Sequence, residues 1–294
     1  MAQTIACANQ KGGVGKTTTV VNLATYLALA GERVLIVDLD PQGNATSGFG
    51  IDRSGLETTL YDVILGDAPL ADTILPTAID RCWIAPASVA LAGAEVELAT
   101  ADQRERRLAK VLAPVKDDYD YILLDCPPSL GLLTVNALTA ADSVLIPTQC
   151  EYYALEGLSQ LIATLNLVRD NLNPALAIKG VVLTMYDGRT NLSADVAAEV
   201  RNHLGNAVYE TIIPRSVRLS EAPSFGVPIA LYRDDSRGAV AYAALAAELL
   251  RRDKRNTRIT TDGQSAQTTS PIAPPAAEAW NASPNEAMAI GVAR

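Results

Sequence analysis

The sequence predicts an α/β protein with a doubly wound, mainly parallel sheet and helices on both faces. Short apolar runs alternate with segments of helical periodicity along most of the 294 residues. The runs at 33–37 and 121–124 are continuously apolar after their first residue, without the polar alternation of a half-exposed strand. Such runs are typical of strands that a parallel sheet buries on both faces.

The remaining elements follow from the same patterns. Helical segments show apolar residues at helical spacing, and the first of them stops at Gly31, as a helix with a C-terminal cap would. The predicted strands are 4–8, 33–40, 82–87, 121–128, 143–147, 177–185 and 208–213, and the predicted helices are 19–30, 60–65, 91–112, 151–169 and 192–204.

The segment 9–18 lies between the first strand and the first helix, which is the context of a phosphate-binding loop. Its glycines allow backbone N–H groups to converge on an anion, and the helix start adds partial positive charge. Lys16 is expected to reach the β- and γ-phosphates, and the Thr17 hydroxyl to ligate Mg²⁺. Gln10 occupies the position where the general motif has its first glycine, and Lys11 follows it.

Three aspartates follow buried strands. Asp38 and Asp40 end one apolar run, and Asp125 ends another. Ligands of doubly wound proteins bind at the carboxyl ends of strands, so these carboxylates are candidates for a Mg²⁺ shell. Asp38 and Asp40 could instead cap the strand end or the next turn.

The loop Lys11-Gly12-Gly13-Val14-Gly15-Lys16-Thr17-Thr18 resembles the deviant Walker A loop of the ParA/MinD/nitrogenase-iron-protein superfamily of ATPases. The resemblance implies that these eight residues bind ATP and that Lys11 crosses a dimer interface to the partner's nucleotide. The alternative is that Lys11 is a solvated loop charge.

The sequence Asp-x-Asp-Pro-Gln-Gly-Asn at 38–44 resembles the switch region of the same family, and Asp-x-Pro-Pro at 125–128 resembles its Walker B ending. By this resemblance Asp40 positions the attacking water and the Mg²⁺ shell, and Asp125 belongs to that shell.

Blocks at 150–157, 185–192 and 213–224 look like those of ParA/Soj chromosome-partitioning ATPases rather than MinD. This resemblance implies an ATP-dependent homodimer that binds double-stranded DNA without sequence preference, and a ParB-like centromere-binding partner that stimulates hydrolysis. It assigns DNA contacts to Arg189 and Arg218, and places Met185, Pro214 and Arg215 near the adenine.

The net charge of −9 argues, taken alone, against a nucleic-acid-binding protein. A dimer would double any local basic patch, which resolves the conflict. The basic cluster Arg251, Arg252, Lys254 and Arg255 could contribute to that patch, or could interact with a helix C-terminus.

Residues 1–255 are predicted to form the ATPase domain, and 256–294, rich in Thr, Ser, Pro and Ala, a disordered tail. The four separated cysteines indicate buried thiols in a reducing compartment. Without a signal peptide or an apolar run of membrane length, we expect a cytoplasmic, nucleoid-associated protein that does not bind membranes.

Two alternatives to DNA partitioning stay open at the level of the sequence. A MinD-like ATPase that positions itself on membranes would need a basic amphipathic C-terminus, which the tail lacks. A metabolic ligase or reductase on this fold would need a small-molecule pocket or cluster-binding cysteines.

Overall fold

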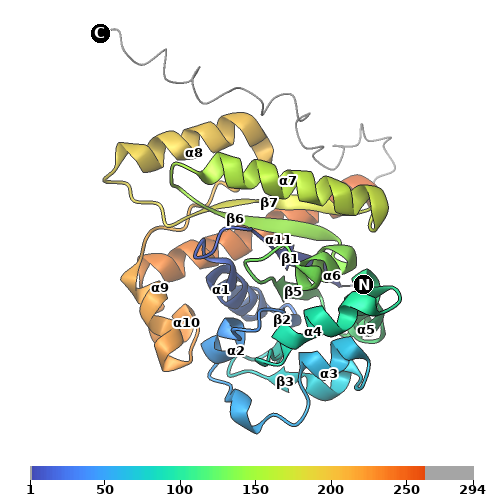
Figure 1. Cartoon of the computed structure of the whole chain (residues 1–294). Coiled ribbons are helices and arrows are strands. Elements are labelled where there is room, and N and C mark those ends of the chain that lie inside the picture. The colour runs from blue at the N-terminus through green and yellow to red at the C-terminus, as the bar shows by residue number, and fades with distance from the viewer. Residues whose placement is uncertain (1, 262–294) are drawn as a thin grey trace, which may run out of the picture.

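The computed structural model describes residues 2–261, with side chains for residues 2–254. Figure 1 shows a central sheet with helices on both faces, which confirms the predicted fold class. The predicted tail lies outside the described residues, except that the last helix continues through Thr261.

Within the described residues, seven strands form one sheet in the order β3-β4-β2-β5-β1-β6-β7. All neighbours pair in parallel except β3, which pairs antiparallel with β4. The strands are β1 (Gln3–Cys7), β2 (Val34–Asp38), β3 (Leu75–Pro76), β4 (Cys82–Ala85), β5 (Tyr121–Asp125), β6 (Ser143–Gln149) and β7 (Ala177–Thr184).

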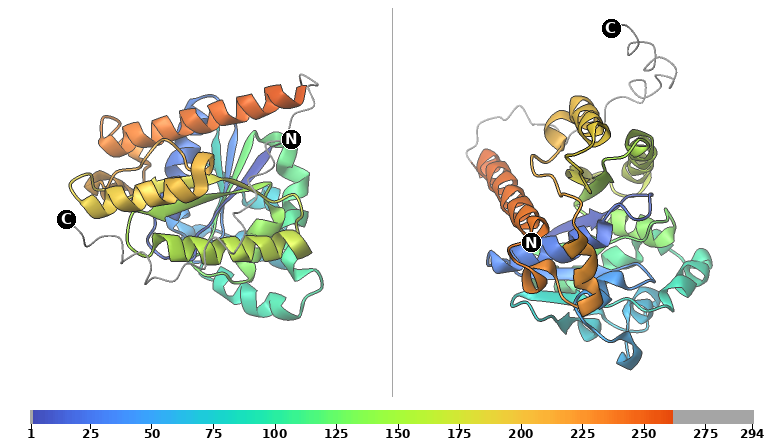
Figure 2. Two further views of the ribbon diagram at one scale, coloured as in Figure 1. Left: turned by 90° about the horizontal axis from the view of Figure 1, so that it is seen from above. Right: turned by 90° about the vertical axis from the view of Figure 1, so that its left-hand side faces the viewer.

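The α-helices cover both faces of the sheet. In Figure 2, α11 and α7 lie on opposite sides of the strands. The helices are α1 (Lys16–Leu29), α2 (Asn44–Gly48), α3 (Leu60–Leu65), α4 (Leu91–Glu97), α5 (Arg107–Leu112), α6 (Leu132–Ala140), α7 (Ala154–Asn171), α8 (Asn191–Leu204), α9 (Val217–Glu221), α10 (Ile229–Tyr232) and α11 (Arg237–Thr261).

Two apolar cores stabilise the sheet, one on each face. Along β1, Ile5 and Cys7 point into the core shared with α1 and α11, whereas Ala6 and Ala8 point into the core shared with α5 to α8. Each fully buried aliphatic side chain contributes about 1.5–3 kcal/mol. Burial on both faces explains why these strands lack polar alternation.

The predicted helix 91–112 is wrong as a single helix. The chain breaks it into α4, two short 3-10 turns and α5, with Gln103 in the left-handed region at φ 51°. The buried side chain of Asn136 satisfies the backbone at this break. Its Nδ2 donates to the Arg104 carbonyl at 2.7 Å, and its Oδ1 accepts from the Leu108 N–H at 3.1 Å. An amide on α6 thus compensates for the helical hydrogen bonds that are lost.

The predicted strand 208–213 is also wrong. This segment follows β7 but joins it only through isolated bridges, at Val208 and at Pro214. Between the two bridges the segment advances six positions while β7 advances five, so no regular ladder forms.

Candidate nucleotide-binding site

The phosphate loop connects β1 to α1 at the carboxyl edge of the sheet. Gly15 precedes the helix with φ 89°, and Gly13 has φ 74°, conformations that side-chain-bearing residues rarely adopt. The first turn of α1 has no acidic residue, and no side chain caps its start. Its free N–H groups therefore offer an anion-binding site, as the sequence predicts.

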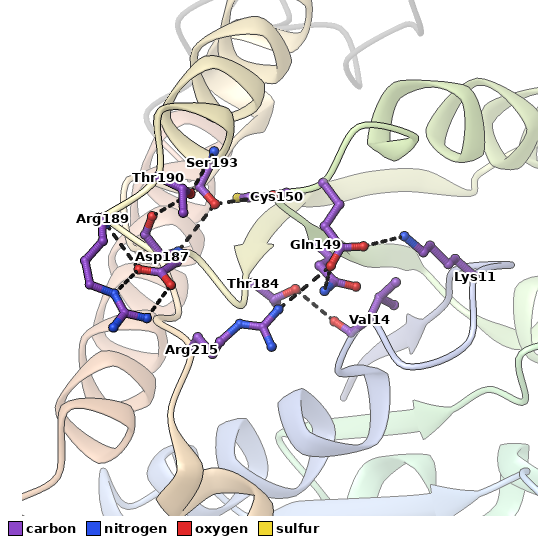
Figure 3. A network of polar contacts seen from close by, with 11 residues as sticks. Lys11, Val14, Gln149, Cys150, Thr184, Asp187, Arg189, Thr190, Ser193 and Arg215 are labelled. Carbon is purple, nitrogen blue, oxygen red and sulfur yellow. Dashed lines mark hydrogen bonds and ion pairs between the residues drawn. The ribbon is translucent and has the colours of Figure 1, made fainter.

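Side chains from neighbouring strand ends fix the loop. Asn9 donates through Nδ2 to the Pro147 carbonyl at 2.7 Å and accepts from the Lys11 N–H at 3.0 Å. The Thr184 hydroxyl donates to the Val14 carbonyl at 2.9 Å (Figure 3). Sequence reasoning missed Asn9 and Thr184. Both residues lie at or just after the ends of strands, and this position could have indicated that they contact the loop.

The two lysines of the loop have different environments. Lys16 is buried, and its Nζ donates to the Lys11 carbonyl at 3.3 Å. Lys11 has a side chain 40% exposed, and its Nζ lies 3.0 Å from Oε2 of Glu151. Arg215 also lies near Glu151, with Nη2 3.8 Å from Oε1. Figure 3 shows Lys11 and Arg215 extending toward this point from opposite sides. No role for Glu151 was predicted from the sequence.

The three aspartates gather beside the loop. Asp125 is fully buried, and neither of its carboxylate oxygens has a hydrogen-bond partner among the described residues. Burial, and then the charge of Asp38, raise the pKa of Asp125 well above its usual value, and Thr17 and Lys16 offset only part of this rise. Asp40 is nearly buried, and its Oδ1 accepts from the Gln42 N–H at 3.0 Å.

Asp38 organises the loop that follows β2. Its Oδ2 accepts from the N–H and hydroxyl of Thr46 at 2.8 and 2.7 Å, and its Oδ1 accepts from the Asp40 N–H at 3.3 Å. Burial raises the pKa of Asp38 to about 6 against these hydrogen bonds. Asp38 could have belonged to a Mg²⁺ shell or capped the strand end or the next turn. Its hydrogen bonds show the second, structural role.

The donor set fits Mg²⁺ together with a phosphate. A buried carboxylate without partners is costly, and a cation beside it removes that cost. Among the described residues, no three or more His, Cys, Asp or Glu side chains form a cluster that could hold a metal. Magnesium uses few protein ligands and fills its shell with phosphate oxygens and water. Asp125, Asp40 and Thr17 would therefore suffice.

Met185, Pro214 and Arg215 lie together at the end of β7. The Tyr186 N–H donates to the Ile213 carbonyl at 3.1 Å, and the Arg215 N–H donates back to the Tyr186 carbonyl at 3.0 Å. Met185 has φ 50°, so the chain turns where the strand ends.

Of the predicted DNA-contacting arginines, Arg189 lies in the loop before α8 and Arg218 lies on α9, two elements that are labelled in Figure 1. The Arg189 side chain is 86% exposed and pairs with Asp187 at 2.7 Å. The Arg218 side chain is 49% exposed and pairs with Glu221 at 2.7 Å. Both cations are accessible, and both are neutralised by a carboxylate nearby in sequence.

The basic cluster at 251–255 is partly used inside the molecule. Arg252 donates to the carbonyls of Asn206 and Val208 at 3.1 and 3.0 Å, and its guanidinium lies 4.1 Å from the Tyr209 ring centroid. Arg251 and Lys254 are exposed. The Arg255 side chain lies outside the described residues.

A cavity of about 430 Å³ lies between the start of α1, α2 and the segment 219–229. Among the described residues, its lining combines apolar side chains with Thr, Asn and Ser and includes no charged residue. All four cysteines are buried and free. Among the described residues, no helix combines the length and apolarity needed to cross a membrane.

Comparison with known proteins shows the family. An AAA domain family model matches residues 2–178. The sporulation initiation inhibitor protein Soj of Bacillus subtilis is 58% identical over 249 residues, covering 85% of this chain and 98% of Soj. The chromosome partitioning protein ParA of Myxococcus xanthus is 55% identical over 249 residues, covering 85% and 88%.

A solved structure with the same fold is that of cobyrinic acid a,c-diamide synthase from Mycobacterium smegmatis with bound ATP analogue and magnesium. It superposes with a TM-score of 0.77 at 39% sequence identity, covering 87% of this chain and 97% of the synthase chain.

Proposed function

Because the chain belongs to the ParA/Soj family of chromosome-partitioning ATPases, we propose that Mg²⁺-ATP joins two copies into a sandwich dimer that binds DNA without sequence preference. While ATP is bound, the dimer associates with the nucleoid in the cytoplasm. A ParB-like centromere-binding partner stimulates hydrolysis, which releases the dimer from the DNA. The observation that carries this proposal is the contrast between the loop lysines: Lys16 is buried in the loop, whereas Lys11 is partly exposed and paired with Glu151.

Within one subunit, Lys16 and the amides of Gly12 to Thr18 bind the phosphates, and Met185, Pro214 and Arg215 contact the adenine. Thr17, Asp40 and Asp125 hold Mg²⁺, which when bound neutralises phosphate charge and orders water. The unpartnered oxygens of Asp125 support this assignment.

Asp40 orients the attacking water through its carboxylate. Asp38 fixes the position of Asp40, because the Asp38 Oδ1 accepts a hydrogen bond from the Asp40 N–H. A catalytic group held through its own backbone stays in place without reorganisation during the reaction.

Lys11 acts on the nucleotide of the partner subunit. Exchanging its ion pair with Glu151 for a phosphate of the facing subunit supplies positive charge where charge develops in the transition state. Turnover therefore depends on dimer geometry, so we expect slow hydrolysis by the isolated chain and stimulation by a partner protein.

Arg189 and Arg218 bind phosphates of the DNA backbone. Their exposure supports this role, and a dimer presents four such guanidinium groups. Binding through phosphates explains the absence of sequence preference and makes the affinity strongly dependent on salt.

The decisive test measures DNA binding and molar mass with ATP, with ADP and without nucleotide. Purified protein should form a dimer with a non-hydrolysable ATP analogue and Mg²⁺, and only this form should bind a random-sequence duplex at moderate salt. A chain that stays monomeric with hydrolysis blocked would refute the sandwich mechanism.

A membrane-positioning ATPase of the MinD kind is the alternative. Co-sedimentation with liposomes or with DNA in the presence of ATP separates the two, because only the membrane reading predicts pelleting with lipid. Synthase activity is less well supported. The synthase is named for an acid, cobyrinic acid, and a pocket for an anionic substrate would be expected to contain Lys or Arg side chains. Among the described residues, no charged side chain lines the cavity beside α1.

A further inference from the structure

The segment after α8 runs beside β7 with a local excess of residues. The Tyr209 N–H donates to the Val181 carbonyl, and the Ile213 N–H donates to the Leu183 carbonyl, both at 2.9 Å. Between these bonds the segment advances four positions while β7 advances two. Glu210, Thr211 and Ile212 therefore form a bulge, which is why no regular strand forms here.

A buried carboxylate on α11 satisfies the bulge. Glu248, 2% exposed, accepts from the Glu210 N–H through Oε1 and from the Thr211 N–H through Oε2, both at 2.9 Å. The Thr211 hydroxyl adds a bond of 2.7 Å to Oε2, and Arg252 donates to Oε1 at 2.7 Å. Burial alone would raise the pKa of Glu248, but these hydrogen bonds hold it below its usual value, so the group is charged at neutral pH.

The close approach to β7 adds a second constraint on the same segment. A Cβ at Gly180 would lie 2.5 Å from the Tyr209 ring and 2.8 Å from the Ala207 carbonyl. Glycine at 180 thus lets the chain enter the bulge directly against the strand.

The bulge sets the register of the residues that follow it. From the Val181–Val208 bridge to the Tyr186–Pro214 bridge the segment advances six positions while β7 advances five, and the Arg215 N–H reaches the Tyr186 carbonyl. In a regular parallel pairing continued from the Val181–Val208 bridge, Ile213 would stand opposite Tyr186 in place of Pro214. The position of Pro214 and Arg215 beside Met185 therefore depends on the bulge.

We propose that Glu248 is a positioning residue for the nucleotide site, which fixes the Pro214–Arg215 backbone against Met185 and thereby sets selectivity for the adenine base. The inference rests on the proposed function, which assigns the base contacts to these residues. Glu248 itself contacts only the protein, so its effect on the nucleotide passes through the backbone of Glu210 and Thr211.

The test compares ATP, GTP and inorganic tripolyphosphate as ligands, each with Mg²⁺. Tripolyphosphate probes the phosphate loop without a base. Glu248→Ala should weaken ATP binding at least tenfold, reduce the preference for ATP over GTP, and leave tripolyphosphate affinity within twofold of wild type. Glu248→Gln keeps one acceptor and should restore part of the ATP affinity. Thr211→Val, which removes only the hydroxyl bond, should act in the same direction with a smaller effect.

Asp253→Asn is the matched control. Asp253 is a buried carboxylate on the same helix, paired with Lys179 and Tyr121 near the amino ends of the strands. Its loss should lower the melting temperature without changing the ratio of ATP to GTP affinity.

Equal losses of ATP and tripolyphosphate affinity in Glu248→Ala, or an unchanged ATP to GTP ratio, would overturn the positioning role. Wild-type protein that binds tripolyphosphate as tightly as ATP would instead refute the base contacts of the proposed function, and this role with them.

Discussion

The buried aspartates of the site predict an unusual pH dependence for the nucleotide-free protein. Burial raises the pKa of Asp38 from 3.8 to about 6 and raises that of Asp125 in the same direction. At pH values between the unfolded and folded pKa values, these carboxyl groups are protonated in the native state and ionised in the unfolded chain. Stability is therefore full below the unfolded value and is lost as the pH rises through the folded value.

The size of the effect follows from Asp38. A rise of roughly two pKa units corresponds to about 3 kcal/mol over the whole range, of which about 1–2 kcal/mol falls between pH 5 and 7.5. For a domain of this size that corresponds to roughly 3–6 °C in melting temperature. Carboxylates with lowered pKa values, such as Asp120 and Asp187, lose their contributions at lower pH, below their unfolded values.

The assay is urea unfolding in EDTA from pH 5 to 7.5, for wild type and Asp125→Asn. Wild type should lose stability as the pH rises. The variant should be more stable than wild type at pH 7.5, because it removes a buried charge without hydrogen bonds, and should show a weaker pH dependence. It should also lose stabilisation by Mg²⁺-ATP. Wild-type stability that is constant or increases over this range would refute the reasoning.

Four substitutions test the separate steps of the proposed cycle. Lys16→Ala should abolish ATP binding in calorimetry, and retained affinity would contradict the loop assignment. Asp40→Ala should bind ATP and remain as a dimer on DNA in sedimentation, whereas unchanged hydrolysis would contradict its role. Arg218→Glu should lose DNA binding in anisotropy while keeping ATP-dependent dimers, and survival of DNA binding at moderate salt would place the patch elsewhere. Glu221→Gln should raise DNA affinity several-fold by freeing Arg218, with Glu199→Gln, an equal charge change at an exposed position on α8, as control; equal gains in both variants would indicate a general charge effect.

The fold was predictable because the sequence features that determine its strands and its phosphate loop lie within short segments of the chain. Strands buried on both faces read as continuous apolar runs, and Gly13 and Gly15 mark the loop because their backbone angles exclude most other residues. The position of Asp125 was predictable for the same reason, since an acid at the end of an apolar run lies at the carboxyl edge of the sheet.

The misses depend on partners distant in sequence. The run 208–213 has the composition of a strand. Its backbone N–H at Thr211 instead donates a hydrogen bond to Glu248, which lies 37 residues later in the sequence. The helix 91–112 breaks where Asn136, 32 residues after Arg104, satisfies the opened backbone. Nothing in the local pattern indicates either interaction. Glu151 was missed as well, because its pairing with Lys11 spans 140 positions.

The same arrangement recurs at every exposed cation that the proposed function requires to bind phosphate. Lys11, Arg189 and Arg218 each pair with a carboxylate: Glu151, Asp187 and Glu221, respectively. Exposed ion pairs are weak and are screened by salt, so a phosphate can replace the carboxylate at small cost.

A single exchange of carboxylate for phosphate therefore gains little, and an isolated subunit should bind DNA poorly, in agreement with the net charge of −9. A dimer makes the same exchanges on one rigid body, where each contact raises the effective concentration for the next. We therefore expect DNA affinity to rise far more steeply on dimerisation than the number of contacts alone would give. This would let the nucleotide control DNA binding without any large rearrangement of the arginine loops.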